Sequence, residues 1–330
     1  MLQSPASPAV PEEPERKDSG SKEEKRPQFG TRFLTNEEEV FKHNAWDQVE
    51  WGEEQENEAL EKVIANSDTL PEEKLLELYN NSADQWDKFY GVHNNKFFKD
   101  RHWLFTEFPE LKLDGHQKNV ETSDAEITGD FTSFHILEVG CGVGNTIFPL
   151  LENTPDKRLF VYGCDFAPTA IDIVRSHELY DTERCLGFVS DISQKELTLP
   201  MPEGSLDIIT MIFVLSAINP SDMQHCVINL VKYIKPGGHI LFRDYGRYDL
   251  AQLRFKNGRC LSDNFYARGD GTKVYFFEQQ EVHDMFEKAG LVRKQNLVDR
   301  RLQVNRGRKL KMYRAWLQCK YMKPLEAQPG

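Results

Sequence analysis

Glycines that follow an acidic residue are the part of this 330-residue chain best suited to bind a nucleotide-like ligand. An apolar run that begins at His135 passes through Glu138 and leads into three alternating glycines, Gly140, Gly142 and Gly144. Because glycine has no Cβ atom, such a loop can pass close to a ligand, and a following helix offers its N-terminal N–H groups. The pattern predicts a nucleotide-cofactor site. The alternative is an ordinary turn between a strand and a helix.

Acidic residues also end the next two apolar runs. Asp165 follows the run 159–164, roughly twenty residues after the glycines, where a carboxylate can accept hydrogen bonds from both hydroxyls of a ribose. The alternative is a helix cap, because an apolar helix pattern follows Asp165. The third run, 185–190, ends on Asp191 and Ile192, a place where methyltransferases commonly have an acid near the adenine.

The spacing of the glycines separates two classes of nucleotide-binding fold. A dinucleotide-binding loop reads G-x-G-x-x-G, whereas E-x-G-x-G-x-G resembles motif I of the S-adenosylmethionine-dependent methyltransferases. Strand-like and helix-like stretches alternate along the chain, which favours an α/β fold: a class I, Rossmann-like methyltransferase sheet of seven mostly parallel strands, with the last strand antiparallel. The expected strands are 135–139, 159–164, 185–190, 206–215, 239–242, 291–298 and 313–321, with helices at 146–152 and 281–289 and a helix stop at Lys235-Pro236-Gly237-Gly238.

Composition indicates a soluble protein with one catalytic domain and additions to it. The chain is 39% hydrophobic, and it has no apolar stretch of the roughly 18 residues that a membrane helix needs. The start lacks an apolar signal core and contains many Glu residues, so we expect a cytoplasmic location. Six cysteines occur singly, which favours free thiols over disulfides or a metal site.

Charge is distributed unevenly along the chain. The net charge is −12, yet residues 232–330 contain 21 Lys and Arg against 10 acidic residues. This basic third predicts a phosphate-binding face, and its alternative is a solvated hairpin between the last two strands. The cations concerned are Arg300, Arg301, Arg306, Arg308, Lys309, Lys311 and Arg314.

Three segments outside the sheet have compositions of their own. Residues 1–28 are rich in Pro, Ser, Glu and Lys, which predicts a disordered tail. Residues 115–133 are polar and without pattern, which predicts a flexible linker between a helical region at 29–114 and the methyltransferase domain at 134–324. A short tail, 325–330, ends the chain.

Aromatic residues are frequent in the region 29–114. Trp86 and Tyr90 are four residues apart and share one face of a predicted helix. Just after them, stacking surfaces alternate with cations, a combination that suits an unstacked base and its phosphates, in Phe97, Phe98, Arg101 and His102. For each aromatic residue, packing in the core is the alternative.

Short strings spread over the chain resemble one methyltransferase family. In order they are FFKDRHWL, ILEVGCGVGN, IFVLSA, KPGG, FRDYGRYD, LRF, NFY, RGDGT and YFF. Over about residues 28–324 the chain is similar to the family that makes 3-methylcytidine at position 32 of tRNA anticodon loops, and most similar to its cytosolic branch associated with threonine and arginine tRNAs. The resemblance implies S-adenosyl-L-methionine as the cofactor, tRNA as the substrate, and a region 29–114 that covers the cofactor and binds tRNA.

The same resemblance implies a role for particular residues. The implied cofactor contacts are Trp86, Tyr90, Gly140, Gly142, Asp165, Asp191, Ile192 and Ile212. The implied substrate contacts are Phe97, Phe98, Arg101, His102, Arg254 and Arg268. Asp244 and Tyr245 are the implied catalytic residues beside the target base.

Asp244 is the residue that we expect to act on the reacting base. Neutral cytosine has an in-plane lone pair on N3, so methylation there needs no base, but it does need a flipped-out nucleotide held in line with the methyl group. Positive charge then develops on the cytosine, and a carboxylate beside N3 and the exocyclic amine would stabilise it. The alternative is a structural ion pair between Asp244 and Arg243 or Arg247.

Two other functions are compatible with the same core. A protein or small-molecule methyltransferase would have no use for the basic C-terminal third. A non-catalytic binding module would not need the glycines and all three acids at the strand ends. An accessory anticodon-binding protein or an aminoacyl-tRNA synthetase could recruit the tRNA, as for enzymes that this chain resembles, although no residue identifies such a partner.

Overall fold

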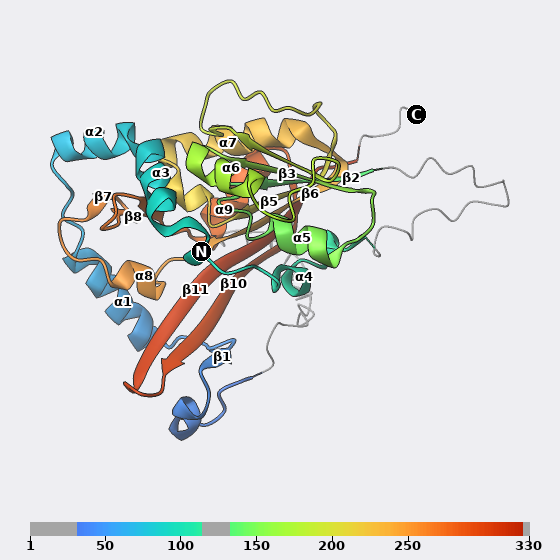
Figure 1. Cartoon of the computed structure of the whole chain (residues 1–330). Coiled ribbons are helices and arrows are strands. Elements are labelled where there is room, and N and C mark those ends of the chain that lie inside the picture. The colour runs from blue at the N-terminus through green and yellow to red at the C-terminus, as the bar shows by residue number, and fades with distance from the viewer. Residues whose placement is uncertain (1–31, 114–132, 326–330) are drawn as a thin grey trace, which may run out of the picture.

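Two β-sheets, one large and one small, organise the molecule. The structure, a computed structural model, describes residues 32–113 and 133–325. The predicted tail at 1–28 lies outside the described residues. So does the predicted linker 115–133 except for its last residue, and so does the predicted tail 325–330 except for its first residue. The large sheet has the order β1-β10-β11-β6-β5-β2-β3-β4 (Figure 1). Its strands are Ala45–Asp47 (β1), Phe134–Val139 (β2), Leu159–Asp165 (β3), Cys185–Val189 (β4), Leu206–Ile212 (β5), Ile234–Tyr245 (β6), Val292–Asn305 (β10) and Leu310–Met322 (β11).

Strands β2 to β6 form the parallel part of the large sheet. They are apolar along most of their length because helices cover both faces. Apolar residues of α5 (Ile147–Asn153) and α6 (Pro168–Arg175) pack on one face, and those of α7 (Pro220–Tyr233) and α9 (Gln279–Lys288) pack on the other. The chain runs outward from β2 to β4 and then returns to the other side of β2 with β5, so the strand order reverses beside β2. Open α/β sheets bind ligands at such a reversal, at the carboxyl ends of the strands.

All seven predicted strands are present, and the predicted antiparallel last strand is confirmed. β11 lies between β6 and β10 and pairs antiparallel with both, for example through Leu317 with Asp244 and with Val298. The last two strands are longer than expected and form a hairpin that extends well beyond the rest of the sheet (Figure 1).

The large sheet has one strand more than predicted. β1 pairs antiparallel with the outer part of β10, with Trp46 opposite Leu302. Trp46 is buried beside Leu302, and its indole N–H donates a hydrogen bond to the carbonyl oxygen of Val40 at 2.8 Å. A strand of three residues is too short to produce an alternating pattern, so tertiary packing rather than local sequence determines it.

The predicted helix stop at Lys235–Gly238 needs a second correction. Helix α7 does end just before it, at Tyr233, but the four residues already belong to β6, whose first residue pairs with Leu206. A Cβ atom on Gly238 would lie 2.8 Å from the carbonyl oxygen of Asp207. The absence of a side chain there lets β6 run past β5 where a turn was expected.

A small sheet that the sequence did not predict follows β6. It consists of β7 (Cys260–Ser262), β8 (Phe265–Ala267) and β9 (Lys273–Tyr275), in that order and antiparallel, and α8 (Leu250–Leu253) precedes it. The β9 strand lies next to the short helix η5 (Leu215–Ala217) that follows β5. The small sheet is thereby held beside the carboxyl ends of the parallel strands.

Most elements of residues 32–113 are helices, apart from β1. Figure 1 shows α1 and β1 beside the outer half of the β10–β11 hairpin, and α3 near α6 at the other end of the molecule. Within the described residues, no helix combines the length and the apolar character required to cross a membrane. The helices are η1 (Glu37–Lys42), α1 (Glu53–Ala65), α2 (Glu72–Asn80), α3 (Ser82–His93), η2 (Asn94–Lys96), α4 (Leu104–Glu107) and η3 (Pro109–Leu111).

Candidate active site

The glycine loop between β2 and α5 has a backbone that other residues would strain. Gly140, Gly142 and Gly144 have φ angles of +60°, +52° and +90°. A Cβ atom on Gly140 would lie 2.5 Å from Val214, and one on Gly142 would lie 2.7 Å from the hydroxyl of Tyr90. The loop therefore needs glycine both for its backbone and for its close contacts.

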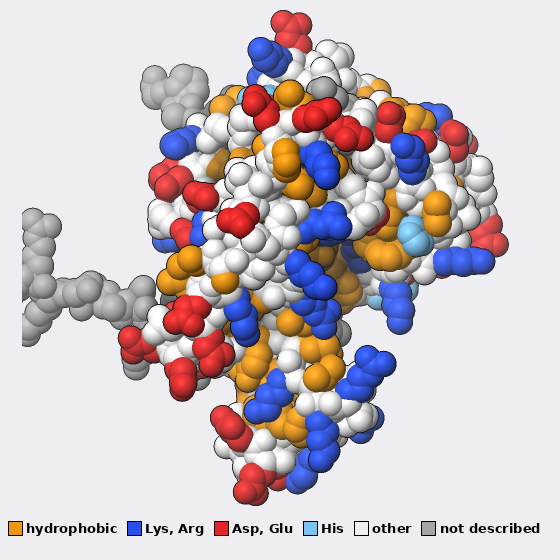
Figure 2. Space-filling model, turned by 90° about the vertical axis from the view of Figure 1, so that its left-hand side faces the viewer, with side chains coloured by type: hydrophobic (Ala, Val, Ile, Leu, Met, Phe, Trp, Pro, Cys, Tyr) orange, Lys and Arg blue, Asp and Glu red, His pale blue; other side chains and the backbone are white. Residues whose placement is uncertain are grey.

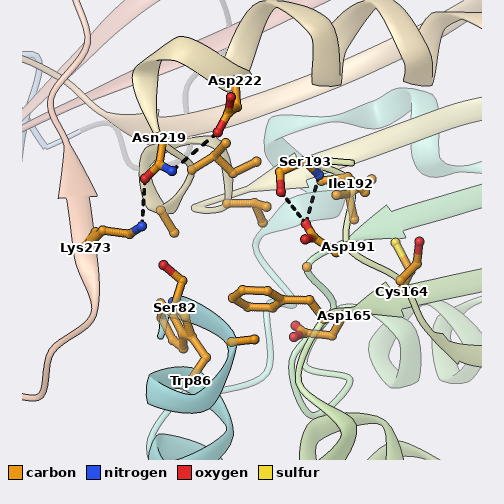
Figure 3. A pocket seen from close by; sticks show the side chains of 18 of the residues that line it. Ser82, Trp86, Cys164, Asp165, Asp191, Ile192, Ser193, Asn219, Asp222 and Lys273 are labelled. Carbon is orange, nitrogen blue, oxygen red and sulfur yellow. Dashed lines mark hydrogen bonds between the residues drawn. The ribbon is translucent and has the colours of Figure 1, made fainter. Parts of the chain in front are cut away.

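A cavity of about 240 Å³ opens at the carboxyl ends of the parallel strands, beside this loop. Figure 3 shows Asp165 and Asp191 on one side of it and Trp86 and Ser82 of α3 on another, with Lys273 and Asn219 across from the strand ends. Most of the wall comes from strand ends and the residues just after them, including Val139, Gly140, Cys164, Asp165, Phe166, Ser190, Asp191, Ile192, Phe213 and Val214. The site is thus a strand-end pocket closed by a helix from the N-terminal region.

Asp165 lies in the cavity wall and also contacts the start of α6, while its predicted contact with a ribose stays a prediction. Its Oδ1 accepts a hydrogen bond from the N–H of Ala167 at 3.0 Å, just before α6, and its Oδ2 accepts one from the N–H of Gly142 at 2.9 Å. Burial raises the pKa of this carboxyl group from 3.8 to about 6. The carboxylate therefore orders the start of α6 and the glycine loop while it forms part of the cavity wall.

Asp191 is fixed by the turn that follows β4. Its Oδ1 accepts hydrogen bonds from the N–H of Ser193 at 2.9 Å and from the Ser193 hydroxyl at 2.7 Å, and its Oδ2 accepts one from the Gln194 side chain at 2.7 Å. Asp191, Ile192 and Ser193 all line the cavity. The two acids predicted to follow the second and third strands therefore face one ligand site.

Arg101 lies against the glycine loop. Its Nη1 is 3.1 Å from Glu138 Oε1 and 3.1 Å from Thr146 Oγ1, and its backbone N–H donates to the carbonyl oxygen of Asn145. Burial raises the pKa of Glu138 to about 7, and the charge of Arg101 acts in the opposite direction. Within the described part of the chain, Glu138 Oε2 is buried without a hydrogen-bond partner. Arg101 therefore packs against the glycine loop, and its predicted contact with the substrate stays a prediction.

Asp244 and Tyr245 end β6 next to this cavity. The Asp244 side chain is fully buried, and its two oxygens accept hydrogen bonds from the N–H groups of Ser216 and Tyr245, both at 2.9 Å. The ring of Tyr245 is 5.0 Å from that of Phe213, which itself lines the cavity. The guanidinium carbon of Arg268 is 5.7 Å from the Tyr245 ring. Phe213 thereby connects the cavity with a second, aromatic and charged site.

The ion pair considered as an alternative role for Asp244 is wrong. Arg243 pairs with Asp299 at 2.7 Å, and Arg247 pairs with Glu278 at 3.1 Å. Burial raises the pKa of Asp244 to about 6, and the hydrogen bonds from Ser216 oppose this effect. The carboxylate is held in place by backbone N–H groups and not by a neighbouring arginine.

Comparisons with known proteins identify the family. A family profile described as a methyltransferase domain matches residues 137–240. The chain is 55% identical over 326 residues to the tRNA N(3)-cytidine methyltransferase METTL2 of Danio rerio, covering 93% of this chain and 92% of that protein. It is 43% identical over 300 residues to the tRNA N(3)-methylcytidine methyltransferase trm140 of Schizosaccharomyces pombe, covering 89% of this chain and 92% of that protein.

This chain belongs to the tRNA N(3)-cytidine methyltransferase family. Among solved structures, the PH0226 protein of Pyrococcus horikoshii matches with a TM-score of 0.49 and 14% identity, over 72% of this chain and 98% of that one. The methyltransferase uses S-adenosyl-L-methionine, and the class I methyltransferase fold expected from the sequence is confirmed.

The cavity fits this cofactor on its own chemistry. Its carboxylates suit the hydroxyl groups of a ribose, and the rings of Trp86 and Tyr90, 5.9 Å apart, offer a stacking surface. The unpartnered Oε2 of Glu138 is a buried acceptor beside the glycine loop, suited to an ammonium group. Gly142 lies against the hydroxyl of Tyr90, so the lack of a side chain there leaves room for the ring of Tyr90 beside the loop.

Ile212 is placed one residue away from the cavity wall. It is buried in β5, whereas Phe213 and Val214, the next two residues of the same apolar run, line the cavity. Phe213 has a φ of +59°, which ends the strand and turns the chain at the mouth of the site. The predicted contact of Ile212 with the cofactor stays a prediction.

The predicted substrate residues other than Arg101 lie in the N-terminal region, near the hairpin and beside Tyr245. Phe97 is 54% exposed and packs with Phe98 and with Phe89 of α3, at ring distances of 4.8 Å in both cases. His102 is exposed. Arg254 is also exposed and lies near Met312 on the hairpin, whereas Arg268 lies beside Tyr245.

Several cavity residues were missed by the sequence analysis. Tyr79 of α2 and Ala83 of α3 line the cavity together with Trp86 and Tyr90. The helical spacing of Ala83 with Trp86 and Tyr90 could have revealed Ala83, whereas Tyr79 belongs to another helix. Lys273 also lines the cavity, and the only available signal was a lone lysine at the start of a strand-like run after the RGDGT string.

Proposed function

We propose that this methyltransferase forms 3-methylcytidine at position 32 of tRNA anticodon loops, on threonine and arginine tRNAs, in the cytoplasm. The observation that carries the proposal is the contact between two sites: Phe213 lines the cofactor cavity and lies against Tyr245, the residue after Asp244. Names of relatives at 43 to 55% identity support the tRNA substrate and the N3 atom. The choice of tRNAs and of nucleotide 32 rests on the sequence resemblance described above, which covers about residues 28–324.

The residues around Tyr245 suit a flipped cytosine. The ring of Tyr245 lies 5.0 Å from that of Phe213, buried Phe276 supports it at 5.7 Å, and Arg268 adds a cation. Aromatic faces stabilise an unstacked base, and a loop nucleotide costs less to extrude than a paired one. These residues therefore account for the holding of the base next to the cofactor cavity.

Asp244 provides charge stabilisation in this proposal. When bound, S-adenosylmethionine supplies an activated methyl group on its sulfonium sulfur. The neutral cytosine N3 attacks with its own lone pair, so no residue needs to remove a proton first. The positive charge that develops on the base is then stabilised by the Asp244 carboxylate, which the N–H groups of Ser216 and Tyr245 hold in place before the reaction.

The basic surface supports binding of an RNA backbone. Figure 2 shows Lys and Arg side chains running down one face of the molecule, next to a hollow with hydrophobic side chains in it, and on to the lower part that the hairpin forms. Of the seven basic residues singled out in the sequence, Arg300, Arg301 and Arg314 pair with acids at Glu56, Asp299 and Asp249. Lys311 is exposed but lies 4.0 Å from Glu37. The remaining three lie exposed at the hairpin tip: Arg306, Arg308 and Lys309.

The test is to incubate the purified protein with labelled S-adenosylmethionine and total tRNA, digest the RNA and identify the methylated nucleoside by mass spectrometry. We expect 3-methylcytidine, mapped to nucleotide 32, and less of it in Asp165→Asn when the cofactor concentration is below saturation. A labelled protein or small molecule in cell extract, with no labelled RNA, would contradict the proposal. Adding an anticodon-binding protein or a synthetase then tests whether a partner selects the tRNA.

A further inference from the structure

Lys273, the first residue of β9, is a buried cation in the wall of the cofactor cavity. Its side chain is 3% exposed, and Nζ donates a hydrogen bond to Oδ1 of Asn219 at 2.7 Å (Figure 3). In the part of the chain that the structure describes, no carboxylate lies within 4.0 Å of this ammonium group. Lysine has three N–H donors, and a buried charge with few partners is costly. Lys273 therefore has donor capacity left on the cavity wall.

The surroundings of Lys273 hold its side chain in one place. Nζ lies 5.1 Å from the ring of Tyr79 and 5.9 Å from the ring of Phe265, both at cation–π distance. Asn219, which accepts from Lys273, also donates from Nδ2 to Asp222 at 3.4 Å. This end of the cavity also has Asp191, which follows the third parallel strand, where the adenine of the cofactor is expected. A purine there offers ring nitrogen atoms that accept hydrogen bonds.

The turn that precedes Lys273 is closely packed. The N–H of Arg268 donates to the carbonyl oxygen of Thr272 at 2.7 Å, and the Oδ1 of Asp270 accepts from the N–H and the hydroxyl of Thr272 at 3.0 and 2.7 Å. Gly271 has a φ of +84°, and a Cβ atom there would lie 2.7 Å from the side chain of Gln85 on α3. The turn therefore has a defined shape and packs directly on the helix that carries Trp86.

The other end of the same turn reaches the target-base site. Arg268 lies over the ring of Tyr245 at 5.7 Å. Burial raises the pKa of Asp244, and the charge of Arg268 acts in the opposite direction. Four residues of one turn thus separate a cation in the cofactor cavity from a cation beside the two predicted catalytic residues.

We propose that Lys273 is a positioning residue that couples the two sites: it donates to the purine end of the cofactor, and the β8–β9 turn carries its position to Arg268 and Tyr245. The proposal rests on the function proposed above. It requires that cofactor and RNA each strengthen the binding of the other by the same factor, because coupling between two sites is reciprocal.

Calorimetry with S-adenosylhomocysteine tests the cofactor end of the proposal. For Lys273→Met we expect a dissociation constant about tenfold higher than that of the unchanged protein, as for one lost hydrogen bond from a charged donor. Lys273→Arg keeps a cation and should stay within about threefold. The matched control, Lys288→Met, removes an exposed lysine at the end of α9 and should change nothing. Equal affinity for Lys273→Met and the control would overturn the proposal.

Fluorescence anisotropy with a labelled anticodon stem-loop tests the coupling. The unchanged protein should bind the stem-loop about fivefold more tightly with S-adenosylhomocysteine than without it, a typical size for coupling between sites. In Lys273→Met this ratio should fall to about one, while the affinity without S-adenosylhomocysteine stays the same. An unchanged ratio would overturn the coupling. Failure of the unchanged protein to bind the stem-loop in either state would contradict the proposed function, whereas the calorimetry would still decide the role of Lys273.

A pH series separates positioning from simple support of the fold. Burial lowers the pKa of Lys273 from 10.5 to about 8. The affinity for S-adenosylhomocysteine should therefore fall as the pH rises from 7 to 9 in the unchanged protein and stay flat in Lys273→Arg. The groups that face Lys273 are Asp222 of α7, Asp191 after β4 and Tyr79 of α2, and burial raises the pKa of Tyr79. The same fall in Lys273→Arg would assign the pH effect to one of these groups and overturn the proposal.

Discussion

The site has a cofactor half, the cavity that contains Asp165, and a base half, formed by Asp244, Tyr245 and Arg268. Backbone N–H groups hold the carboxylate of each half, but the surroundings of the two carboxylates differ. Asp165 and Asp244 each accept hydrogen bonds from two backbone N–H groups, and burial raises the pKa of each to about 6. Asp165 is surrounded by neighbouring parallel strands and the glycine loop. Asp244 is at the end of one strand, and the cation that faces it, Arg268, comes from the small sheet. The first half is part of the central sheet, whereas the second depends on a peripheral element that packs against it.

The largest effect on turnover is expected from a substitution in the base half alone. Asp244→Asn keeps the shape of the side chain but removes its charge, so the turnover number should fall by about 100-fold to 1,000-fold, the cost of losing one electrostatic stabiliser of a transition state. The dissociation constant for the cofactor should stay within about twofold. Single-turnover methylation of tRNA and calorimetry measure the two quantities, and unchanged turnover would remove Asp244 from the mechanism.

The matching change in the cofactor half should reverse this pattern. Asp165→Asn should raise the dissociation constant for S-adenosylhomocysteine by about 30-fold, because hydrogen bonds to a charged group contribute about 2 kcal/mol. Turnover at saturating cofactor should fall much less than in Asp244→Asn. Thermal melting in the absence of ligand serves as the control, since Asp165 also orders the start of α6.

The pH dependence of turnover sharpens the assignment of the charge to Asp244. Its pKa of about 6 lies above the ordinary 3.8, so the carboxyl group is neutral below about pH 6 and charged above it. With saturating cofactor and tRNA, turnover should fall about tenfold per pH unit below 6 and reach a plateau above it. This acid limb should be absent from the residual activity of Asp244→Asn.

The same shift affects stability in the opposite direction. Because the pKa is raised in the folded state, the contribution of Asp244 to stability is full below about 3.8 and is lost as the pH rises through about 6. Asp244→Asn should therefore melt at a higher temperature relative to the unchanged protein at pH 8 than at pH 5. A constant difference between the two proteins would contradict the shifted pKa.

A pair of glycine substitutions tests how tightly the cofactor half is built. Gly142→Ala places a Cβ atom 2.7 Å from the Tyr90 hydroxyl at a φ of +52°, so cofactor affinity should fall about fivefold and stability by about 1 kcal/mol. Gly91, next to Tyr90 in α3, has nothing within 4 Å of its Cβ position. Gly91→Ala should instead stabilise the protein by about 0.5 kcal/mol and leave the cofactor affinity unchanged. Equal effects in calorimetry and thermal melting would show that the loop tolerates a side chain.

The smallest expected effects lie at the hairpin tip, far from both carboxylates. Arg306→Ala and Arg308→Ala should each weaken tRNA binding by about threefold and reduce its salt dependence, because each removes at most one phosphate contact. Binding titrations at several salt concentrations measure this. Arg300, whose guanidinium pairs with Glu56 and lies 5.9 Å from the ring of Trp51, provides the contrast. Arg300→Ala should leave the salt dependence the same, and a larger effect there than at the tip would reassign the RNA surface.

The cofactor half could be predicted because its residues follow contiguous apolar runs. Gly140, Asp165 and Asp191 lie at or just after the ends of β2, β3 and β4, and a parallel sheet brings such ends together whatever the details of packing. The same logic located the sheet, the antiparallel last strand and the helix face of Trp86 and Tyr90. Local pattern was sufficient wherever the chain had to bury a long apolar segment.

Other contacts of the molecule could not be derived in the same way. Lys273 is placed by a strand of three residues, and β1 is equally short, so neither has a periodic pattern to read. Arg101 was assigned to the substrate because its neighbours are aromatic, yet its side chain pairs with Glu138, 37 residues away in sequence. Contacts of this kind depend on which distant segment offers an opposite charge, which no local pattern contains.

The pairing of β1 with β10 has a consequence for the order in which the chain becomes native. Trp46 leaves the ribosome long before its partner Leu302. The segment around β1 must remain unpaired while the residues between them are made, because the hairpin edge that it covers does not exist until then. Its docking is expected to be a late step of folding, and the indole of Trp46, buried only after that step, would report it as a change in fluorescence.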